Sequence, residues 1–438
     1  MKIYLRQKEV YPWTIAGGIS FRGYFIEDDV FYNGNHAIRR LLELFELERI
    51  ENVLQQLNGA FCLIWEKDEQ VVCAVDRLRS LPLFYTRNDG NMQIGDDVDA
   101  LVKNMPVRNI LEISEKEFIS TSLFVTGNKT LLEGLYQVEA GTFCVFDKET
   151  SKISTVQYFQ MEHGEFVNDF NELEKNFWQA YGMVAKHLVR ALNGRTAVIP
   201  LSGGADSRMV LTMLKMEEYK NVICYTYGRE NNAEAEISRH VAEEFGYPWI
   251  FVPYTKKMWK EARKSKELLD YKEYAFAFTS TPHLQDFLAV KYLTGKKMIP
   301  QDGVFVPGHS GDLIAGSHIT KEYLKKDLSR DAFLQSVYSK FFTSHIDSEI
   351  KEGIAKRFPL CEAGETEKMA SWTEWFNIQE RQAKFIVNSV RVYEFFGHEW
   401  LIPLWDNCLF EFWKLSCNTV HSCSVLFHNL KEGRLSFW

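Results

Sequence analysis

The chain has 438 residues, of which 46% are hydrophobic and 25% charged, and its net charge is −8 at pH 7. This length exceeds the size at which a single core usually stops growing, so we expect two folded domains and exclude a disordered chain. The acidic balance argues against nucleic acid as the main partner, because phosphate binding needs clustered Lys and Arg.

The cysteines and the amino-terminal segment indicate the compartment. The eight cysteines are scattered without zinc-like spacing, and several stand in apolar runs, which favours buried free thiols. No stretch is long and apolar enough to span a membrane, and MKIYLRQKEV lacks the apolar core of a signal peptide. We therefore expect a cytoplasmic protein without a membrane partner.

The first 160 residues predict short strands with turn signals and one helical stretch. Residues 36–57 have apolar side chains at helical spacing. The β-branched and aromatic runs that read as strands are residues 19–32, 59–65, 70–77, 81–87 and 141–147. This pattern predicts an α+β domain.

The rhythm changes beyond residue 160. A helical stretch at 171–192 is followed by strands that alternate with amphipathic helices, which predicts βαβ units and a parallel sheet. The expected strands are 196–201, 221–228, 249–254 and part of 304–308, and the expected helices are 206–219 and 233–246. We place the domain boundary near 160, giving domains 1–160 and 161–438.

The first of these strands ends in the sequence VIPLSGGADSR, residues 198–208. The carboxyl edge of a parallel sheet is where such folds bind ligands, and a helix N-terminus attracts anions. Gly203 and Gly204 allow close backbone approach, Ser202 and Ser207 add hydroxyls, and Asp206 can hold a metal that bridges phosphates. The alternative is an ordinary strand-to-helix turn in which Asp206 or Ser207 is the helix N-cap.

SGGADS resembles the S-G-G-x-D-S loop of the N-type ATP pyrophosphatases, and its surroundings resemble the asparagine synthetase family, which includes β-lactam synthetase-like members. The segments that carry the likeness are residues 57–86, 130–147, 308–316 (GHSGDLIAG) and 395–406 (FFGHEWLIPLWD). The resemblance implies an α+β amino-terminal domain of the Ntn-hydrolase-like glutamine amidotransferase type, a sandwich that is inactive here. An α/β domain of the adenine nucleotide alpha hydrolase-like PP-loop fold would follow it.

The resemblance also implies roles for individual residues, with ATP and Mg²⁺ as cofactors. Asp206 and Asp312 would carry Mg²⁺, since two carboxylates facing one polyphosphate need a cation between them. The residues expected to bind ATP are Leu201, Ser202, Gly203, Gly204, Asp206, Ser207, Tyr225, Thr226, Tyr227, Gly228 and Gly308.

Three departures from the family pattern affect the expected chemistry. Position 2 is Lys2, where glutamine-using members have a catalytic cysteine, and the first cysteine, Cys62, stands in an apparently buried strand, so we expect no glutaminase activity. His309 replaces a glutamate and Leu313 another; His309 is either a general base or a solvated loop residue. The nearest candidate for the lysine expected to neutralise pyrophosphate is Lys431, with Arg434 or another cation as the alternative.

The segment 371–406 combines charged and aromatic residues. Its polar residues either face the cleft or form a solvated helix face, and they are Arg381, Asn388, Arg391 and Glu394. Its tryptophans, with Trp413, favour core packing. Asp406 is either a family-matched residue or a cap, and for Asp76 and Arg77 we expect a structural ion pair.

These features predict an ATP-dependent amide-forming ligase that activates a carboxylate as its acyl-adenylate, releases pyrophosphate and lets ammonia or an amine attack. The expected partners are a small-molecule or glycan carboxylate and an amine or ammonia donor, with no nucleic acid and no membrane; a homodimer is left open. The alternative is a catalytically impaired relative that binds nucleotide or acts as a scaffold.

Overall fold

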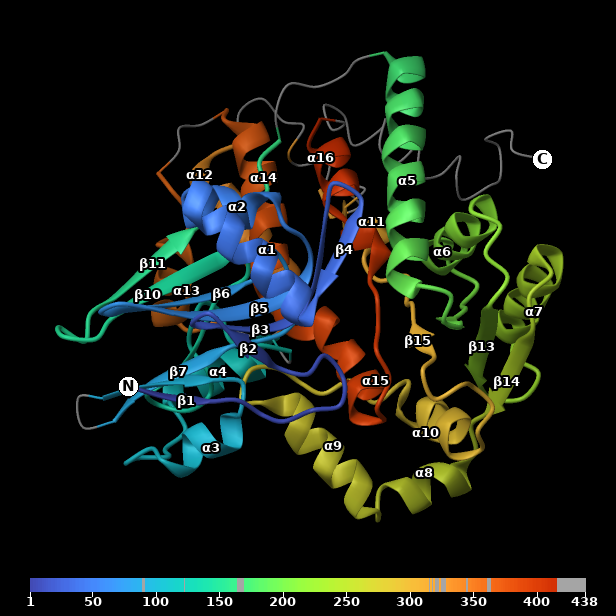
Figure 1. Cartoon of the computed structure of the whole chain (residues 1–438), viewed down its shortest axis with the longest axis horizontal. Coiled ribbons are helices and arrows are strands. Elements are labelled where there is room, and N and C mark those ends of the chain that lie inside the picture. Colours follow the sequence, from blue (N-terminus) through green and yellow to red (C-terminus); the bar gives the residue numbers. More distant parts are fainter. Residues whose placement is uncertain are drawn as a thin grey trace.

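The computed structural model describes residues 1–88, 91–121, 123–163, 169–314, 316, 318–319, 323, 328–343, 346–360 and 364–415. Figure 1 shows two sheet-containing regions, one built from the amino-terminal half of the chain and one from the carboxyl-terminal half. Helices of the last hundred residues lie between and against both regions (Figure 1). The two-domain α/β arrangement expected from the length is therefore present.

The larger amino-terminal sheet has seven antiparallel strands in the order β11-β10-β6-β5-β3-β2, with β4 paired to β3. Its central strands are buried along most of their length, which explains their nearly continuous apolar sequence. The strands are β2 (Thr14–Ala16), β3 (Ile19–Glu27), β4 (Val30–Asn33), β5 (Asn58–Lys67), β6 (Gln70–Val75), β10 (Thr142–Asp147) and β11 (Ile153–Gln157).

A smaller sheet in the order β1-β8-β7-β9 accompanies it, and β1 and β8 run parallel. Its strands are β1 (Lys2–Tyr4), β7 (Phe84–Asn88), β8 (Asn91–Gly95) and β9 (Leu135–Gln137). The helices of this half are α1 (Gly34–Leu47), α2 (Ile50–Gln56), α3 (Val98–Lys103) and α4 (Glu112–Thr121). The α+β pattern predicted for this half is thus observed.

The carboxyl-terminal half contains a four-stranded parallel sheet in the order β14-β13-β12-β15. The chain moves outward from β12 through β13 to β14 and then returns to the other side of β12, so the strand order reverses beside β12. Ligands bind at such a switch point, outside the carboxyl ends of the strands. The strands are β12 (Ala197–Pro200), β13 (Val222–Gly228), β14 (Trp249–Pro253) and β15 (Val304–Phe305).

Helices cover this sheet and connect it to the amino-terminal half (Figure 1). Those before and among the strands are α5 (Phe170–Leu192), α6 (Ala205–Met216), α7 (Ala233–Phe245), α8 (Lys256–Ala262), α9 (Lys266–Phe276) and α10 (Phe287–Gly295). Those after β15 are α11 (Gly311–Ile314), α12 (Arg330–Phe341), α13 (Ser348–Ala355), α14 (Thr366–Phe376), α15 (Arg391–Phe395) and α16 (Asn407–Leu415). No helix in the described ranges is both long and apolar enough to cross a membrane.

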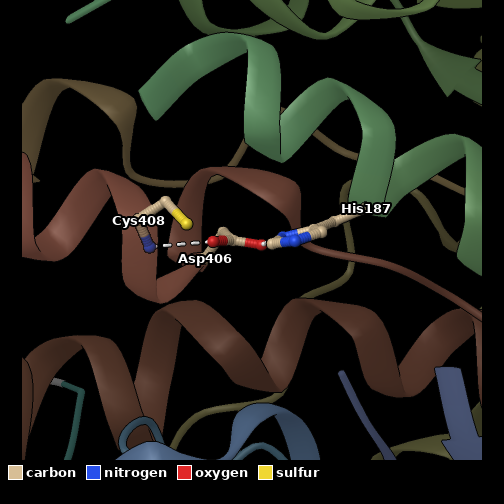
Figure 2. A group of neighbouring side chains, drawn as sticks. All are labelled: His187, Asp406 and Cys408. Carbon is tan, nitrogen blue, oxygen red and sulfur yellow. Dashed lines mark hydrogen bonds and ion pairs between the residues drawn. The ribbon is translucent and has the colours of Figure 1, made fainter. Parts of the chain in front are cut away.

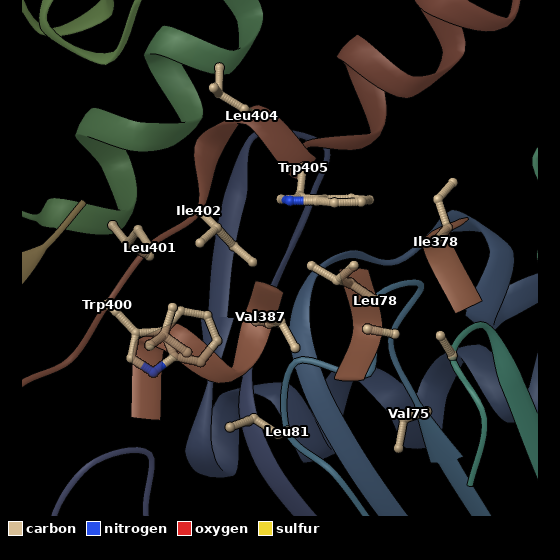
Figure 3. Packing of buried hydrophobic residues seen from close by; sticks show 14 of the residues in the cluster. Val75, Leu78, Leu81, Ile378, Val387, Trp400, Leu401, Ile402, Leu404 and Trp405 are labelled. Atoms are coloured by element: carbon tan, nitrogen blue, oxygen red, sulfur yellow. The ribbon is translucent and has the colours of Figure 1, made fainter. Parts of the chain in front are cut away.

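Between α14 and α15 the chain forms a π-helical stretch, η2 (Asn377–Ile386), and a 3₁₀ turn, η3 (Val387–Val390); a further turn is η4 (Pro403–Trp405). Figure 3 shows side chains of this region packed against residues such as Leu78 and Leu81 of the amino-terminal half. The predicted core role of the tryptophans is confirmed, since all are at most 9% exposed: Trp372, Trp375, Trp400, Trp405 and Trp413.

Charged residues are also buried where the two halves meet, and Glu394 is central among them. Its carboxylate pairs with Arg391 at 2.6 Å and with Arg22 and Lys8 at 3.5 Å each. Burial raises the pKa of Glu394, but the positive charges of Arg391, Lys8 and Arg22 outweigh burial and hold that pKa below its usual range. We call these four residues the interface cluster; it joins the two halves electrostatically.

The expected ion pair between Asp76 and Arg77 is absent. Asp76 instead accepts backbone hydrogen bonds from Phe61, Leu78 and Ser80 at 2.8–3.1 Å, whereas Arg77 pairs with Glu411 at 3.3 Å. Adjacent residues in a tight turn point their side chains apart, so Asp76 orders its own turn.

Candidate active site at the strand edge

The loop after β12 is ordered by its own hydroxyl groups. The backbone N–H of Gly204 donates to Ser202 Oγ at 3.1 Å, and the N–H of Ser202 donates to Ser207 Oγ at 3.2 Å. Helix α6 starts at Ala205 with Gly204 as N-cap and no side-chain cap, so neither Asp206 nor Ser207 caps the helix. The N-cap glycine thus offers no side-chain acceptor to the first turn of α6, and a helix N-terminus at this edge of the sheet suits an anion.

A second loop, which follows β15, lies directly against the first. A Cβ atom on Gly308 would come within 2.5 Å of the backbone N of Ser207, and one on Gly311 would come within 3.0 Å of the Asp206 carboxylate. At position 308 only glycine permits this approach, because the contact is with backbone, whereas a Cβ at position 311 would require the Asp206 side chain to shift by a few tenths of an ångström. The backbone of α11, which includes position 312, therefore runs beside Asp206, while the Asp312 side chain lies outside the described part of the structure.

Two adjoining cavities open at this edge, and together we call them the strand-edge cleft. The loop cavity, of about 520 Å³, lies over the first turn of α6 and the second loop. The aromatic cavity, of about 590 Å³, lies over the ends of β12, β13 and β14. The two cavities adjoin, since four residues line both: Pro200, Ser202, Tyr227 and Gln285.

The cleft brings together most of the residues that the sequence singled out. Those in the loop cavity are Ser202, Gly204, Asp206, Ser207, Tyr227, Gly308 and His309. Those in the aromatic cavity are Leu201, Ser202, Tyr225, Thr226, Tyr227 and Gly228. Gly203 lines neither cavity and instead faces Ile237 and Glu234 of α7. Lys431 and Arg434 lie outside the described residues.

His309 is partly buried in the loop cavity, so the solvated alternative does not hold. Its Nε2 lies 3.2 Å from Ser389 Oγ, which itself donates to the carbonyl of Ile386 at 2.7 Å. The Nδ1 of the same ring lies 3.5 Å from that Oγ, so either ring nitrogen can share the Ser389 hydroxyl, depending on the tautomer. Burial, together with neighbouring His283, lowers the pKa of His309 to about 3, and the imidazole is neutral at pH 7.

Several residues of the loop cavity escaped the sequence analysis, namely His283, Asp286, Ser389 and Tyr393. Asp286 accepts a hydrogen bond from Tyr393 Oη at 2.8 Å, and burial raises the pKa of its carboxyl despite hydrogen bonds from Tyr227 and Tyr393. Burial likewise lowers the pKa of His283 to about 4. His283 and Asp286 come from a loop without periodic pattern, so no sequence signal marked them.

The aromatic cavity has a flat wall made by Tyr227 and Tyr254, whose rings stack at 4.8 Å with an interplanar angle of 14°. Tyr254 Oη donates to the carbonyl of Gln285 at 2.6 Å, which fixes the ring. Tyr254 follows β14 directly, so the rule that ligands bind at strand carboxyl ends would have found it. A planar heterocycle can stack on such a wall.

One of the two alternatives for the polar residues of 371–406 was that they face the cleft. They do not line it. Asn388 and Arg391 face a different pocket between the two halves, and Glu394 belongs to the interface cluster. All three are at most 8% exposed, so the solvated alternative is wrong as well. Arg381 is not among the residues that line either cavity of the cleft.

Asp406 lies behind the cleft, in the cluster drawn in Figure 2. One carboxylate oxygen accepts from the backbone N–H of Cys408 at 2.8 Å, while the other lies 2.7 Å from His187 Nδ1 and accepts from Asn58 at 2.8 Å. Burial raises the pKa of the Cys408 thiol to about 12. Because the thiol is protonated and the carboxylate is hydrogen-bonded on both oxygens, we interpret this group as structural and call it the joint of His187 and Asp406. The bond to the N–H of Cys408 supports the capping interpretation of Asp406.

The thiols of the amino-terminal half are structural. Cys62 is fully buried in β5, as expected, and burial holds its pKa well above the usual value for cysteine. The same holds for Cys73, and burial raises the pKa of Cys144 to about 11. A nucleophilic cysteine needs a thiolate, and these three thiols stay protonated near pH 7.

Comparison with known proteins first defines the class. A family model described as a glutamine amidotransferase domain matches residues 26–159, the stretch that contains most of the larger amino-terminal sheet. Asparagine synthetase 3 (glutamine-hydrolysing) of Bacillus subtilis (strain 168) is 23% identical over 252 residues, which cover 55% of this chain and 40% of that protein. The chain thus spans less than half the length of this relative.

These two matches confirm the predicted resemblance: part of the chain is similar to a glutamine amidotransferase domain and to an asparagine synthetase. Among solved structures, NH3-dependent NAD synthetase of Campylobacter jejuni is 12% identical and aligns over 43% of this chain and 93% of its own, with a TM-score of 0.23. Glutamine phosphoribosylpyrophosphate amidotransferase of B. subtilis is 8% identical and aligns over 67% and 62%, with a TM-score of 0.24. Likenesses at such TM-scores carry no argument.

Proposed function

We propose that the protein is an ATP-dependent ligase that activates a carboxylate as its acyl-adenylate, releases pyrophosphate and forms an amide with ammonia or an amine. The observation that carries this proposal is the contact of the two loops at the switch point of the parallel sheet. Uncapped backbone N–H groups, serine hydroxyls and the Asp206 carboxylate meet there beside a cavity of about 520 Å³. The asparagine synthetase-like character of the chain supports the same reaction class.

In this proposal the two cavities of the cleft bind different parts of ATP. The aromatic cavity takes the adenine against Tyr227 and Tyr254, and the uncapped turn of α6 takes the leaving phosphates. Asp206 and Asp312 hold Mg²⁺, which would offset the charge on those phosphates. The fit rests on Gly311, because the absence of a side chain there lets the second loop approach the Asp206 carboxylate.

The carboxylate and amine substrates occupy the part of the loop cavity lined by His283, His309 and Ser389. His309 is neutral there, and the lone pair of its unprotonated ring nitrogen is the base. A base works best when its pKa lies near the working pH, and a bound polyphosphate would bring negative charge that raises the pKa of His309. His309 therefore becomes an effective base only with ATP in place.

We further propose that the chain divides near residue 160 into an amidotransferase-like domain without glutaminase activity and the ligase domain. The buried, protonated thiols of Cys62, Cys73 and Cys144 support the loss of that activity. Lys2 lies in an edge strand of the smaller sheet rather than in a catalytic pocket. The amino-terminal half then acts as a scaffold for the cleft.

The test is a screen for AMP and pyrophosphate with ATP, Mg²⁺ and paired panels of carboxylates and amines, including uronic acids. We expect at least one pair to give stoichiometric AMP, pyrophosphate and amide, and glutamine to give no glutamate. Asp206→Asn should remove this turnover, whereas Asp302→Asn, at an exposed carboxylate before β15, should keep it. Unchanged turnover in Asp206→Asn would contradict the proposal.

A second candidate function is nucleotide binding without catalysis. The pKa of about 3 for His309 favours it, because an imidazole that stays neutral is a weak base. Saturable binding of ATP–Mg²⁺ by calorimetry, together with no AMP across the whole screen, would select this function over the ligase.

A further inference from the structure

A pocket separate from the strand-edge cleft lies between the two halves of the protein. Six cationic side chains line it, and they are Arg6, Lys8, Arg22, Arg79, Lys384 and Arg391. The amino-terminal half contributes the first four, and the segment from η2 to α15 contributes the last two. So many cations around one buried space require compensating negative charge.

Five of the six cations have a carboxylate partner within 4 Å. Arg6 pairs with Asp97, Lys8 and Arg391 with Glu394, Arg22 with Asp96, and Lys384 with Glu380. Arg79 is the exception among the described residues, since no ion pair is formed by its guanidinium. Three carboxylates, those of Asp96, Asp99 and Glu273, also line the pocket, so Arg79 is its one lining cation without a carboxylate of the described residues within 4 Å.

Arg79 is only 3% exposed, yet most of its donors are unused. Its Nη1 donates to the carbonyl of Ala383 at 3.2 Å, while Nε and Nη2 are buried without a hydrogen-bond partner. One face of the guanidinium lies over the Phe84 ring, 5.4 Å from its centroid. Leaving buried charged donors unpaired costs several kcal/mol, so a partner is expected.

The backbone of Arg79 adds to this cost. Its φ of +55° is in the left-handed region, which glycine adopts freely and an arginine does not. Burial lowers the pKa of Arg79 to about 9, with neighbouring Arg391 adding to the effect, and the guanidinium is still charged at pH 7. A strained, buried and unpaired cation is stable when something negative binds beside it.

The shape of the unused donor pair defines the ligand chemistry. Nε–H and Nη2–H point in parallel along one side of the guanidinium, which matches the two oxygens of a carboxylate. The pocket has a volume of about 50 Å³, and a water molecule needs about 10–15 Å³ on the same measure. That volume admits a few non-hydrogen atoms and excludes a nucleotide or a peptide.

We propose that Arg79 is the anchor of a binding site for a small planar anion of the carboxylate type, held between the two halves of the protein. The anion accepts two hydrogen bonds from Nε and Nη2, the donors that the described residues leave without a partner. This proposal does not depend on the ligase activity, because Arg79 lines neither cavity of the strand-edge cleft.

The site also shares a wall with the cleft. Val387, Asn388 and Arg391 line the Arg79 pocket, while Ser389 and Val392 of the same stretch line the loop cavity. Opposite sides of one helical segment thus face the two spaces. An anion bound at Arg79 orders the segment that carries Ser389, the hydroxyl in contact with His309.

The test measures the melting temperature of the full chain in acetate, bicarbonate, sulfate or chloride at one ionic strength. In the wild type, acetate or bicarbonate should raise it by about 2 °C at ten times the half-saturating concentration. Arg79→Gln should abolish the rise, and Arg108→Gln, the same charge change at an exposed arginine, should keep it. Acetate alone would identify a carboxylate-bearing molecule, and bicarbonate alone would identify bicarbonate itself.

Arg79→Lys tests the paired geometry and serves if Arg79→Gln does not fold. Lysine keeps the charge but lacks two parallel N–H groups, so the half-saturating concentration should rise at least tenfold. Sulfate, which is tetrahedral, should shift wild type and Arg79 variants equally. Equal responses of wild type, Arg79→Gln and Arg79→Lys to acetate and to bicarbonate would overturn the proposal.

Discussion

The strand-edge cleft and the interface cluster both contain polar side chains, but these side chains line a cavity in the cleft and are paired with one another in the cluster. In the cleft, Ser202 and Asp206 face a cavity of about 520 Å³ and the N–H groups beside them lack a side-chain cap. In the interface cluster, Glu394 is surrounded by three cations and is almost inaccessible. One set of polar groups is left open to a ligand, and the other is neutralised within the protein.

The difference teaches how to distinguish function from architecture in this chain. Buried charges whose partners all lie within the protein join the two halves of the chain. Donors without a hydrogen-bond partner beside a cavity can instead bind a ligand. By this criterion Arg391 and Glu394 are structural, although their helical spacing near the cleft had made them candidates. Arg79, whose Nε and Nη2 have no hydrogen-bond partner among the described residues, belongs to the second kind.

The largest effect is expected from breaking the interface cluster. Glu394→Gln leaves Arg391, Arg22 and Lys8 without their shared carboxylate, and the free energy of unfolding should fall by about 3–5 kcal/mol in urea titrations. The control Glu261→Gln, at an exposed pair with Lys257, should change it by less than about 0.5 kcal/mol. Similar losses in both variants would remove the distinction between the two regions.

In the cleft, Asp206→Asn should weaken Mg²⁺-dependent ATP binding at least tenfold, because it removes the carboxylate charge that lines the loop cavity. Calorimetry with and without Mg²⁺ measures this change, and Asp302→Asn is the matched control. Equal ATP affinity in both variants would show that Asp206 holds no metal.

Within the cleft, the aromatic cavity can be separated from the loop cavity. Tyr254→Ala removes the ring that stacks on Tyr227 and should lower ATP affinity about 3–10-fold, while inorganic triphosphate binding stays the same. Tyr254→Phe keeps the ring and should bind ATP within about twofold of the wild type. An equal loss for ATP and triphosphate in Tyr254→Ala would mean that the ring does not contact the base.

The smallest effect is expected from pH at the joint of His187 and Asp406. Burial alone would lower the pKa of His187, but the hydrogen bond and charge of Asp406 outweigh it and raise that pKa. The stabilisation is thus fully present below the unfolded pKa of about 6.5 and is lost as pH rises through the folded value. Urea titrations from pH 5.5 to 8.5 should show this loss in the wild type relative to His187→Gln.

The matched control for pH is His240→Gln, an exposed histidine on α7. Its pH dependence of stability should follow the wild type. His309 acts in the opposite sense, because its lowered pKa makes the fold less stable as pH falls below about 6.5. A wild-type curve that coincides with His187→Gln over the whole range would contradict the role of the His187 joint.

Much of the architecture could be predicted, because the periodicity of apolar residues and the ends of strands can both be recognised in short stretches of sequence. The alternation of strands and helices from residue 196 onward gave the parallel sheet, and β12, α6, β13, α7 and β14 lie where the pattern predicted them. The short strands β1, β2, β8, β9 and β11 escaped, since three to five residues carry too little pattern and their pairing is decided by partners far along the chain.

The candidate site divides in the same way. Residues next to a strand end, such as Ser202 and Tyr227, were found because the edge of a parallel sheet places them together. His283 and Asp286 could not be found, because they come from a loop whose position depends on tertiary packing. The burial of Asn388, Arg391 and Glu394 also depends on partners such as Arg22, which lies several hundred residues away along the chain.

The contact of Gly308 with the start of α6 has a consequence for how this site can diversify. The two loops meet backbone to backbone, within a distance that any Cβ atom at position 308 would block. Their spacing is therefore independent of the side chains that the loops carry. The side chain of His309, which lines the loop cavity, can therefore be exchanged without moving this frame, whereas Leu313 is 1% exposed and belongs to the core.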